Sequence, residues 1–115
     1  MGANELQAKA DVAKRELIHK LRRTLHEYHE DGGHGWLKVS KVIINALGIA
    51  SEISGYSYEY NGQVYLEEDL DAAIYLKAIF PEGIISETFS QFWQLYVTSI
   101  NDGDSSNIRS FPHYV

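Results

Sequence analysis

The chain of 115 residues contains no cysteine, only two prolines and one methionine. The absence of thiols excludes disulfides, thiolate catalysis and sulfur-ligated metal sites. No apolar run approaches the roughly 18 residues that span a bilayer, and charged residues stand where a signal peptide would have its apolar segment. A glycine-rich phosphate loop and a nucleophile-elbow serine are also missing. These absences predict a cytoplasmic protein without membrane contact, and they favour a non-enzymatic protein without a cofactor.

The charge is acidic, with a formal net value of −6, and it is unevenly distributed. Residues 1–31 carry six Lys or Arg and six Asp or Glu, whereas residues 32–115 carry four and ten. An acidic surface disfavours direct binding of nucleic acid and favours a protein partner with a basic surface, including nucleic-acid enzymes. Solubility alone is the competing explanation for this charge.

Length and an apolar content of 44% predict a single domain over residues 1–115, with one core. Residues 1–31 are expected to hold a long N-terminal helix that begins after Asn4 as N-cap and continues to about His29. Its apolar residues recur every three or four positions, at Leu6, Ala10, Ala13, Leu17, Leu21, Leu25 and Tyr28. The glycines that follow Asp31 would end this helix. The same spacing is typical of a coiled-coil seam, so a homodimer formed through this helix is an alternative.

Residues 33–115 are expected to form an α+β core around a small, mainly antiparallel sheet. Residues 36–39 have the composition of a short strand, and Ser40 can cap a brief helix that follows. The clearest element is a hairpin, in which strands at 56–60 and 63–66 flank the preferred turn Asn61-Gly62. Its register would place Tyr58 opposite Tyr65.

A second, buried helix is predicted from Leu70 to Phe80, with Asp69 as its N-cap. The pattern of residues 84–100 fits a helix as well as a strand. The strand-forming side chains of residues 92–97 favour a strand there.

Three histidines, at 26, 29 and 34, would share one side of the predicted helix and its end, where they could ligate a transition metal. The metalloprotease spacing of two histidines around a glutamate is absent, and histidines at a helix end also interact favourably with the helix dipole.

The densest charge cluster is formed by Glu67, Glu68, Asp69 and Asp71, at the passage from hairpin to helix. Carboxylates can hold a divalent cation, or one of them can act as a general base. Capping and the helix dipole explain Asp69 and Asp71, but they leave Glu67 and Glu68 without a structural role. His34 lies between two glycines, which suits an exposed functional group.

Four segments of the chain resemble a family of small uncharacterised proteins that phages, plasmids and other bacterial mobile elements encode. They are Gly33-His34-Gly35-Trp36-Leu37-Lys38-Val39, the region from Leu47 to Tyr58, Tyr65-Leu66-Glu67-Glu68-Asp69 and Ser106-Asn107-Ile108-Arg109-Ser110-Phe111. The resemblance covers residues 33–80 and the tail, and Leu70 stands where many members have a cysteine. It implies a bacterial host cell and a mobile-element setting, but no reaction.

The leading hypothesis is therefore an acidic binding protein of a mobile element that inhibits a host defence nuclease in the manner of an anti-CRISPR protein. The alternatives are a metal-dependent hydrolase or a small anionic-ligand-binding protein with a His, carboxylate and Arg site, and a helix-mediated dimer with a purely structural role. The predicted binding residues are His34, Tyr56, Tyr58, Glu67, Glu68, Asp69, Asp71 and Arg109.

Overall fold

The computed structural model describes residues 2–115, in which five strands form one mixed sheet of order β3-β4-β2-β1-β5. The strands are β1 (His26–Glu30), β2 (Gly35–Ser40), β3 (Tyr58–Tyr60), β4 (Gln63–Glu67) and β5 (Val97–Asn101). Neighbouring strands are antiparallel except for β1 and β5, which are parallel. The α+β class is as predicted.

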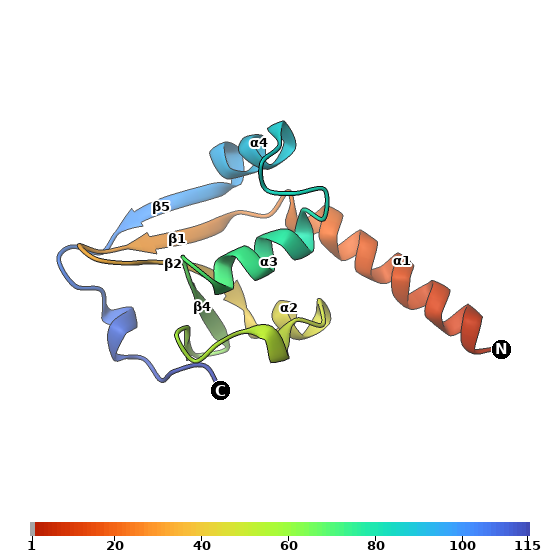
Figure 1. Ribbon diagram of the computed structural model, residues 1–115, viewed down its shortest axis with the longest axis horizontal. Helices are drawn as coiled ribbons and strands as arrows, with labels where there is room; N and C mark the ends of the chain where they lie inside the picture. The colour runs from red at the N-terminus through yellow and green to blue at the C-terminus, as the bar shows by residue number, and fades with distance from the viewer. Residues whose placement is uncertain (1) are drawn as a thin grey trace.

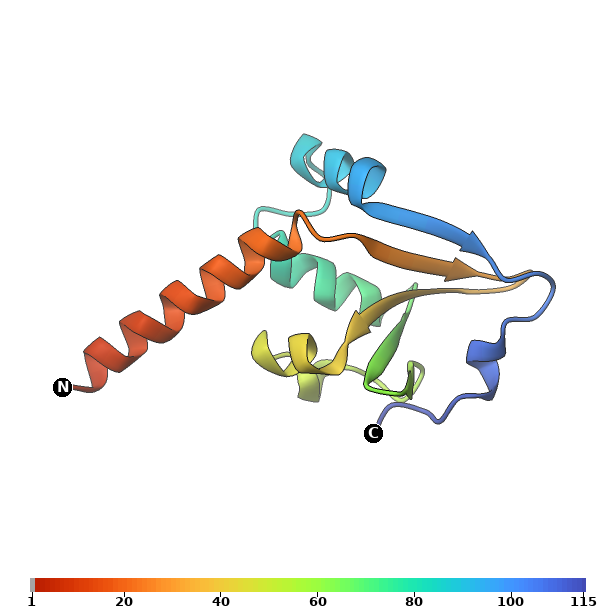
Figure 2. The ribbon, with the colours of Figure 1, turned by 180° about the vertical axis from the view of Figure 1, so that it is seen from behind.

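The helices are α1 (Ala3–Leu21), α2 (Lys41–Ala46), α3 (Asp71–Ile79) and α4 (Glu87–Tyr96), with short 3-10 segments η1 (Ala50–Glu52) and η2 (Asn107–Ser110). Helix α3 lies across one face of the sheet, and α1 projects away from the body (Figures 1 and 2). Within residues 2–115, no helix combines the length and the apolar character needed to cross a membrane.

Both faces of the central strand β2 are covered, by different parts of the chain. Leu37 and Val39 point into the main core, which contains side chains of α2 and α3. Trp36 points to the opposite face, where it forms a smaller cluster with Tyr65 and Ile108. Because Ile108 belongs to η2, the C-terminal segment closes the face of the sheet that α3 leaves open.

Helix α1 is shorter than predicted, because it ends at Leu21 and residues 26–30 form β1. The apolar spacing does continue through Tyr28, but residues 26–30 are equally compatible with a strand. Strand β1 gains hydrogen bonds from β2 on one side and β5 on the other. Long-range pairing therefore decides a segment whose local pattern fits both structures.

The residues predicted to begin and to end this helix are also wrong. The N-cap is Gly2, without a side-chain hydrogen bond, and not Asn4. Asp31 and the glycines after it form the turn between β1 and β2.

The hairpin and the brief helix are confirmed. Tyr58 pairs with Tyr65, and Asn61 and Gly62 have φ values of 51° and 76°, as a type I′ turn requires. Strand β3 is shorter than predicted. The Ser40 side chain caps α2 by accepting a hydrogen bond from the Val42 amide at 3.2 Å.

The predicted buried helix is present as α3, but Asp69 does not cap it, because Leu70 occupies the N-cap position without a side-chain hydrogen bond. The strand expected at 92–97 is wrong. These residues belong mostly to α4, and β5 begins only at Val97. The missed signal is Ser86, whose hydroxyl caps α4 by accepting from the Phe89 amide at 3.1 Å.

Candidate metal centre

The turn between β1 and β2 holds His34 in place through Asp31. One carboxylate oxygen of Asp31 accepts hydrogen bonds from the amides of Gly33 and His34, both at 3.0 Å. The Asp31 side chain is fully shielded from solvent. Arg109 binds it with two nitrogens, Nε at 2.5 Å and an Nη at 2.8 Å. This ion pair ties the turn to η2, and it holds the pKa of Asp31 far below its ordinary value.

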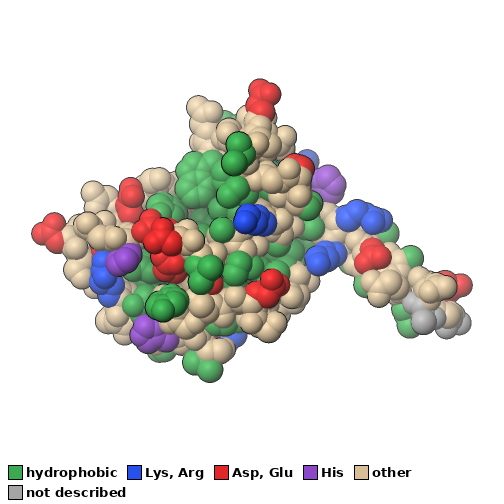
Figure 3. Space-filling view, viewed as in Figure 1, with side chains coloured by type: hydrophobic (Ala, Val, Ile, Leu, Met, Phe, Trp, Pro, Cys, Tyr) green, Lys and Arg blue, Asp and Glu red, His purple; other side chains and the backbone are tan. Residues whose placement is uncertain are grey.

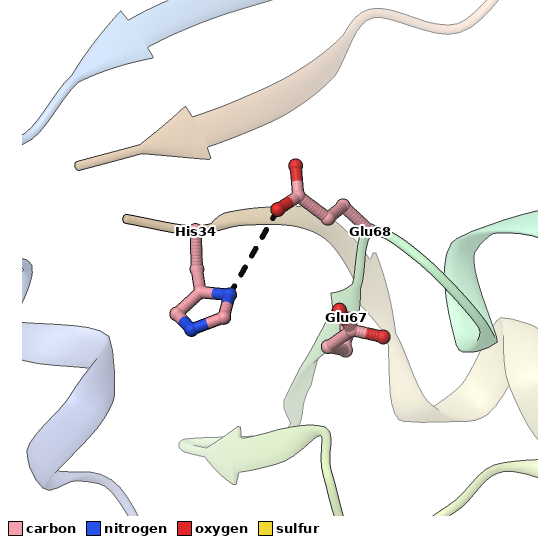
Figure 4. A group of neighbouring side chains, drawn as sticks. All are labelled: His34, Glu67 and Glu68. Atoms are coloured by element: carbon pink, nitrogen blue, oxygen red, sulfur yellow. Dashed lines mark ion pairs between the residues drawn. The ribbon is translucent and has the colours of Figure 1, made fainter. Parts of the chain in front are cut away.

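Glu68 is positioned next to this turn by Tyr28 and Gly35. The Glu68 amide donates to the Gly35 carbonyl at 3.1 Å, and the Tyr28 hydroxyl donates to Glu68 Oε2 at 2.8 Å. A Cβ at position 35 would overlap the Tyr28 hydroxyl and lie 3.0 Å from Glu68 Oε2, so glycine is required by space. The free oxygen, Oε1, lies 3.9 Å from His34 Nδ1 (Figure 4).

Glu67, at the end of β4, supplies the third polar group. Its amide donates to the Ser57 hydroxyl at 2.9 Å, which fixes the backbone. Its two carboxylate oxygens accept from the amides of Asp69 and Leu70, each at 3.1 Å. Glu67 therefore stabilises the turn that leads into α3, a structural role that sequence patterns did not indicate.

His34, Glu67 and Glu68 together form a candidate metal centre. One ligand atom from each lies within 4.8 Å of the others. Imidazole nitrogen and carboxylate oxygen are the usual ligands of zinc and related divalent ions, and a small closure of the side chains would bring the three atoms to bonding distance. His34 is half exposed and Glu68 one-third exposed, so three protein ligands would leave coordination positions open to solvent.

The electrostatic surroundings are negative. Burial raises the pKa of Tyr28 well above its ordinary value. The hydrogen bond to Glu68 raises this pKa further, and so do the negative charges of Glu68, Glu30 and Asp69. No Lys or Arg in residues 2–115 forms an ion pair with Glu67, Glu68 or Asp69. Acidic side chains gather beside a histidine on the face shown in Figure 3.

Asp71 does not belong to this group. It is completely buried and accepts hydrogen bonds from the Ser54 amide and hydroxyl and from the Ser57 hydroxyl, the last at 2.5 Å. Its role is structural, because it anchors the loop before β3 to the start of α3. Asp69 is exposed and close enough to Tyr28 to act on it electrostatically.

The other predicted binding residues surround Trp36 or are separate from the site. The Arg109 guanidinium lies 5.4 Å from the centre of the Trp36 ring, and Asp31 occupies two of its nitrogens. Tyr58 packs against Trp36 and against His113, at centroid distances of 6.3 and 4.7 Å. Tyr56 is 74% exposed. The predicted anion-binding role of Arg109 is thus opposed by its ion pair with Asp31.

The three histidines do not form the predicted cluster, because the segment is a strand. His26 faces the core, where its Nε2 lies 2.6 Å from the Tyr75 hydroxyl and its Nδ1 lies 2.7 Å from the Thr24 carbonyl. His29 lies on the other face, beside Tyr65. His34 alone reaches the candidate metal centre.

A polar cluster that sequence patterns did not indicate contains His29, Asp102 and Ser106, beside a hollow of about 250 Å³. Asp102 lies between the other two, 3.1 Å from His29 Nδ1, and it accepts from the Ser106 hydroxyl at 2.7 Å. Nucleophilic serines need the histidine in the central position. This order therefore provides no base for Ser106 and opposes a hydrolytic triad.

Tyr28 and Gly35 were missed as contributors to the candidate metal centre. The apolar spacing predicts a helix at Tyr28, and in a helix this side chain would lie far from the hairpin. For Gly35 a signal did exist, since a glycine beside a strand often marks a close approach of another group.

Comparison of the chain with family models, with curated proteins and with solved structures finds no match. The resemblance to proteins of phages and plasmids therefore stays a prediction, as do the bacterial setting and the cytoplasmic location. The candidate metal centre carries the functional argument.

Proposed function

We propose that the protein binds a divalent transition-metal ion, such as Zn²⁺ or Mn²⁺, through His34, Glu67 and Glu68. The observation that carries this proposal is the convergence of an imidazole and two carboxylates from the ends of β2 and β4 within 4.8 Å. Mixed nitrogen and oxygen ligands suit these ions better than Ca²⁺ or Mg²⁺, which prefer oxygen alone.

Two features beyond the ligands support metal binding. The Tyr28 hydroxyl orients Glu68, and backbone amides orient Glu67, as outer hydrogen bonds do in known metal sites. The carboxylates also lack a neutralising Lys or Arg in the described residues 2–115, so a cation would relieve their mutual repulsion.

The test is a titration of the purified protein with ZnCl₂ and with MnCl₂, followed by calorimetry and by NMR. We expect Mn²⁺ to broaden the signals of residues 34, 67 and 68 first, and the His34→Ala variant to bind at least about tenfold more weakly. The matched control is His19→Ala, which removes an exposed histidine on α1. Equal affinity of the two variants would show that the metal binds histidines without preference and would reject the site.

A second candidate function is binding of a basic protein partner through the same acidic face. The negative surroundings of Tyr28, to which Glu30, Glu68 and Asp69 contribute, favour it. Such binding should weaken with salt, because exposed charges are screened. A nucleic-acid enzyme, including a defence nuclease, is a partner of this chemistry, and a partner bound equally well by a Glu68→Gln, Asp69→Asn variant would oppose this function.

A further inference from the structure

Helix α1 leaves most of its surface without intramolecular cover. Every residue from 4 to 16 is exposed, and only the last turn, with Leu17, Ile18 and Leu21, packs against the body. Figures 1 and 2 show the helix extending outward, with the N-terminus far from the sheet. The molecule therefore measures 55 Å in its longest direction and only 19 Å in its shortest.

The exposed part carries an apolar seam formed by Leu6, Ala10 and Ala13, and the half-buried Leu17 continues it towards the body, at alternating spacings of four and three. Leu6 at the outer end is 58% exposed. The uncovered stretch of residues 4–16 gains no tertiary contacts. Helical segments of only about 12–15 residues are marginally stable in water without such contacts. A second helix along the seam would provide these contacts, and the two central alanines permit an interaxial distance of about 8 Å.

The charged residues beside the seam distinguish the possible orientations of a second copy. In an antiparallel pair, Leu6 faces Leu17 of the second copy and Ala10 faces its Ala13. The flanking positions then bring Lys9 next to Glu16 of the second copy, and symmetry repeats this attraction. In a parallel pair, Lys9 of each copy would lie next to Lys14 of the other copy. Two pairs of like charges would then repel each other.

We propose that α1 is a dimerisation helix that pairs antiparallel with α1 of a second copy of this chain. Because α1 projects away from the sheet (Figures 1 and 2), an antiparallel pair places the two bodies at opposite ends of the paired helices. The seam has four layers, which correspond to about two heptads, whereas a stable coiled coil has roughly three to four heptads. The dimer is therefore reversible and depends on concentration. This inference is independent of the metal site.

The first test is sedimentation equilibrium from micromolar to millimolar concentration. We expect reversible dimerisation, which Leu6→Glu abolishes while far-UV circular dichroism shows the folded body retained. Lys9→Glu and Glu16→Lys each place like charges together and weaken the dimer about tenfold, and the double charge exchange restores it. A protein that stays monomeric throughout, or a Lys9→Glu variant that dimerises more tightly, overturns the proposal.

The second test measures orientation and uses the absence of native cysteine. The variants Ala10→Cys and Ala13→Cys are oxidised separately and as a mixture. The antiparallel pair predicts that the mixture gives the highest yield of cross-linked dimer, because positions 10 and 13 face each other across the seam. A higher yield from Ala10→Cys alone indicates a parallel pair and overturns the proposed orientation.

Discussion

Asp31 shows how one residue can organise a site in which it takes no direct part. Its buried carboxylate binds the turn that presents His34 and also Arg109 of the C-terminal segment. The pKa of Asp31 in the folded protein lies below its unfolded value of about 3.9. Its contribution to stability is therefore complete at neutral pH and is lost only as the pH falls below about 4.

Gly35 is the residue at which a single added methyl group should lower the stability of the fold. We expect Gly35→Ala to lower the free energy of unfolding by about 1–3 kcal/mol, because the added Cβ displaces Tyr28 from a packed position. Urea denaturation measures this loss. Tyr28→Phe separates stability from metal binding, because it removes only the hydrogen bond to Glu68. This variant should remain nearly as stable as the wild type and bind Zn²⁺ roughly tenfold more weakly. Unchanged stability of Gly35→Ala would contradict the close approach.

His26 should make the fold sensitive to mild acid. Burial lowers its pKa below the unfolded value of about 6.5, so the unfolded state takes up a proton first as the pH falls. The free energy of unfolding should decrease from pH 7 towards pH 5, by at most about 1.4 kcal/mol per pH unit from this group. Denaturation at several pH values checks this, with His26→Gln expected to have a smaller slope and the exposed His19→Gln to keep the wild-type slope. Equal slopes for His26→Gln and the wild type would assign the acid sensitivity to other groups.

At the scale of single elements, those defined by local contacts were predictable. The Asn61-Gly62 turn needs two residues with positive φ, and Ser40 caps α2 through an amide two positions along the chain. Helix α1 and helix α4 were misjudged, because their residues fit more than one periodicity. The end of α1 depends on the pairing of β1 with β2 and β5, which no local pattern contains.

Ser86 should be the local determinant of α4. We expect Ser86→Ala to destabilise the protein by about 1 kcal/mol, because the Phe89 amide loses its hydrogen-bond acceptor. Ser90→Ala, on the exposed side of the same helix, is the matched control and should change stability little. Chemical denaturation compares the two, and equal effects would mean that packing alone defines where α4 begins.

At the scale of the whole molecule, the C-terminal segment completes the structure. Tyr114 is part of the main core and donates to the Ala50 carbonyl at 2.7 Å, whereas Ile108 covers Trp36 on the other face of the sheet. The segment also supplies Arg109 to the turn that carries His34. Core and candidate metal centre therefore depend on the same long-range closure, which joins segments nearly eighty positions apart.

The sequence by itself determined the α+β class, the hairpin, α2 and α3, and it identified His34, Glu67 and Glu68 as chemically notable, because each of these depends on local spacing, turn chemistry or residue type. Only the tertiary structure decided that β1 is a strand, that β5 joins it in parallel, that Asp71 is buried and that Asp31 neutralises Arg109. Only the sheet order brought the ends of β2 and β4 together. The physical reason is that strand pairing and burial depend on partners distant in the chain, and these choose among the structures that the local pattern permits.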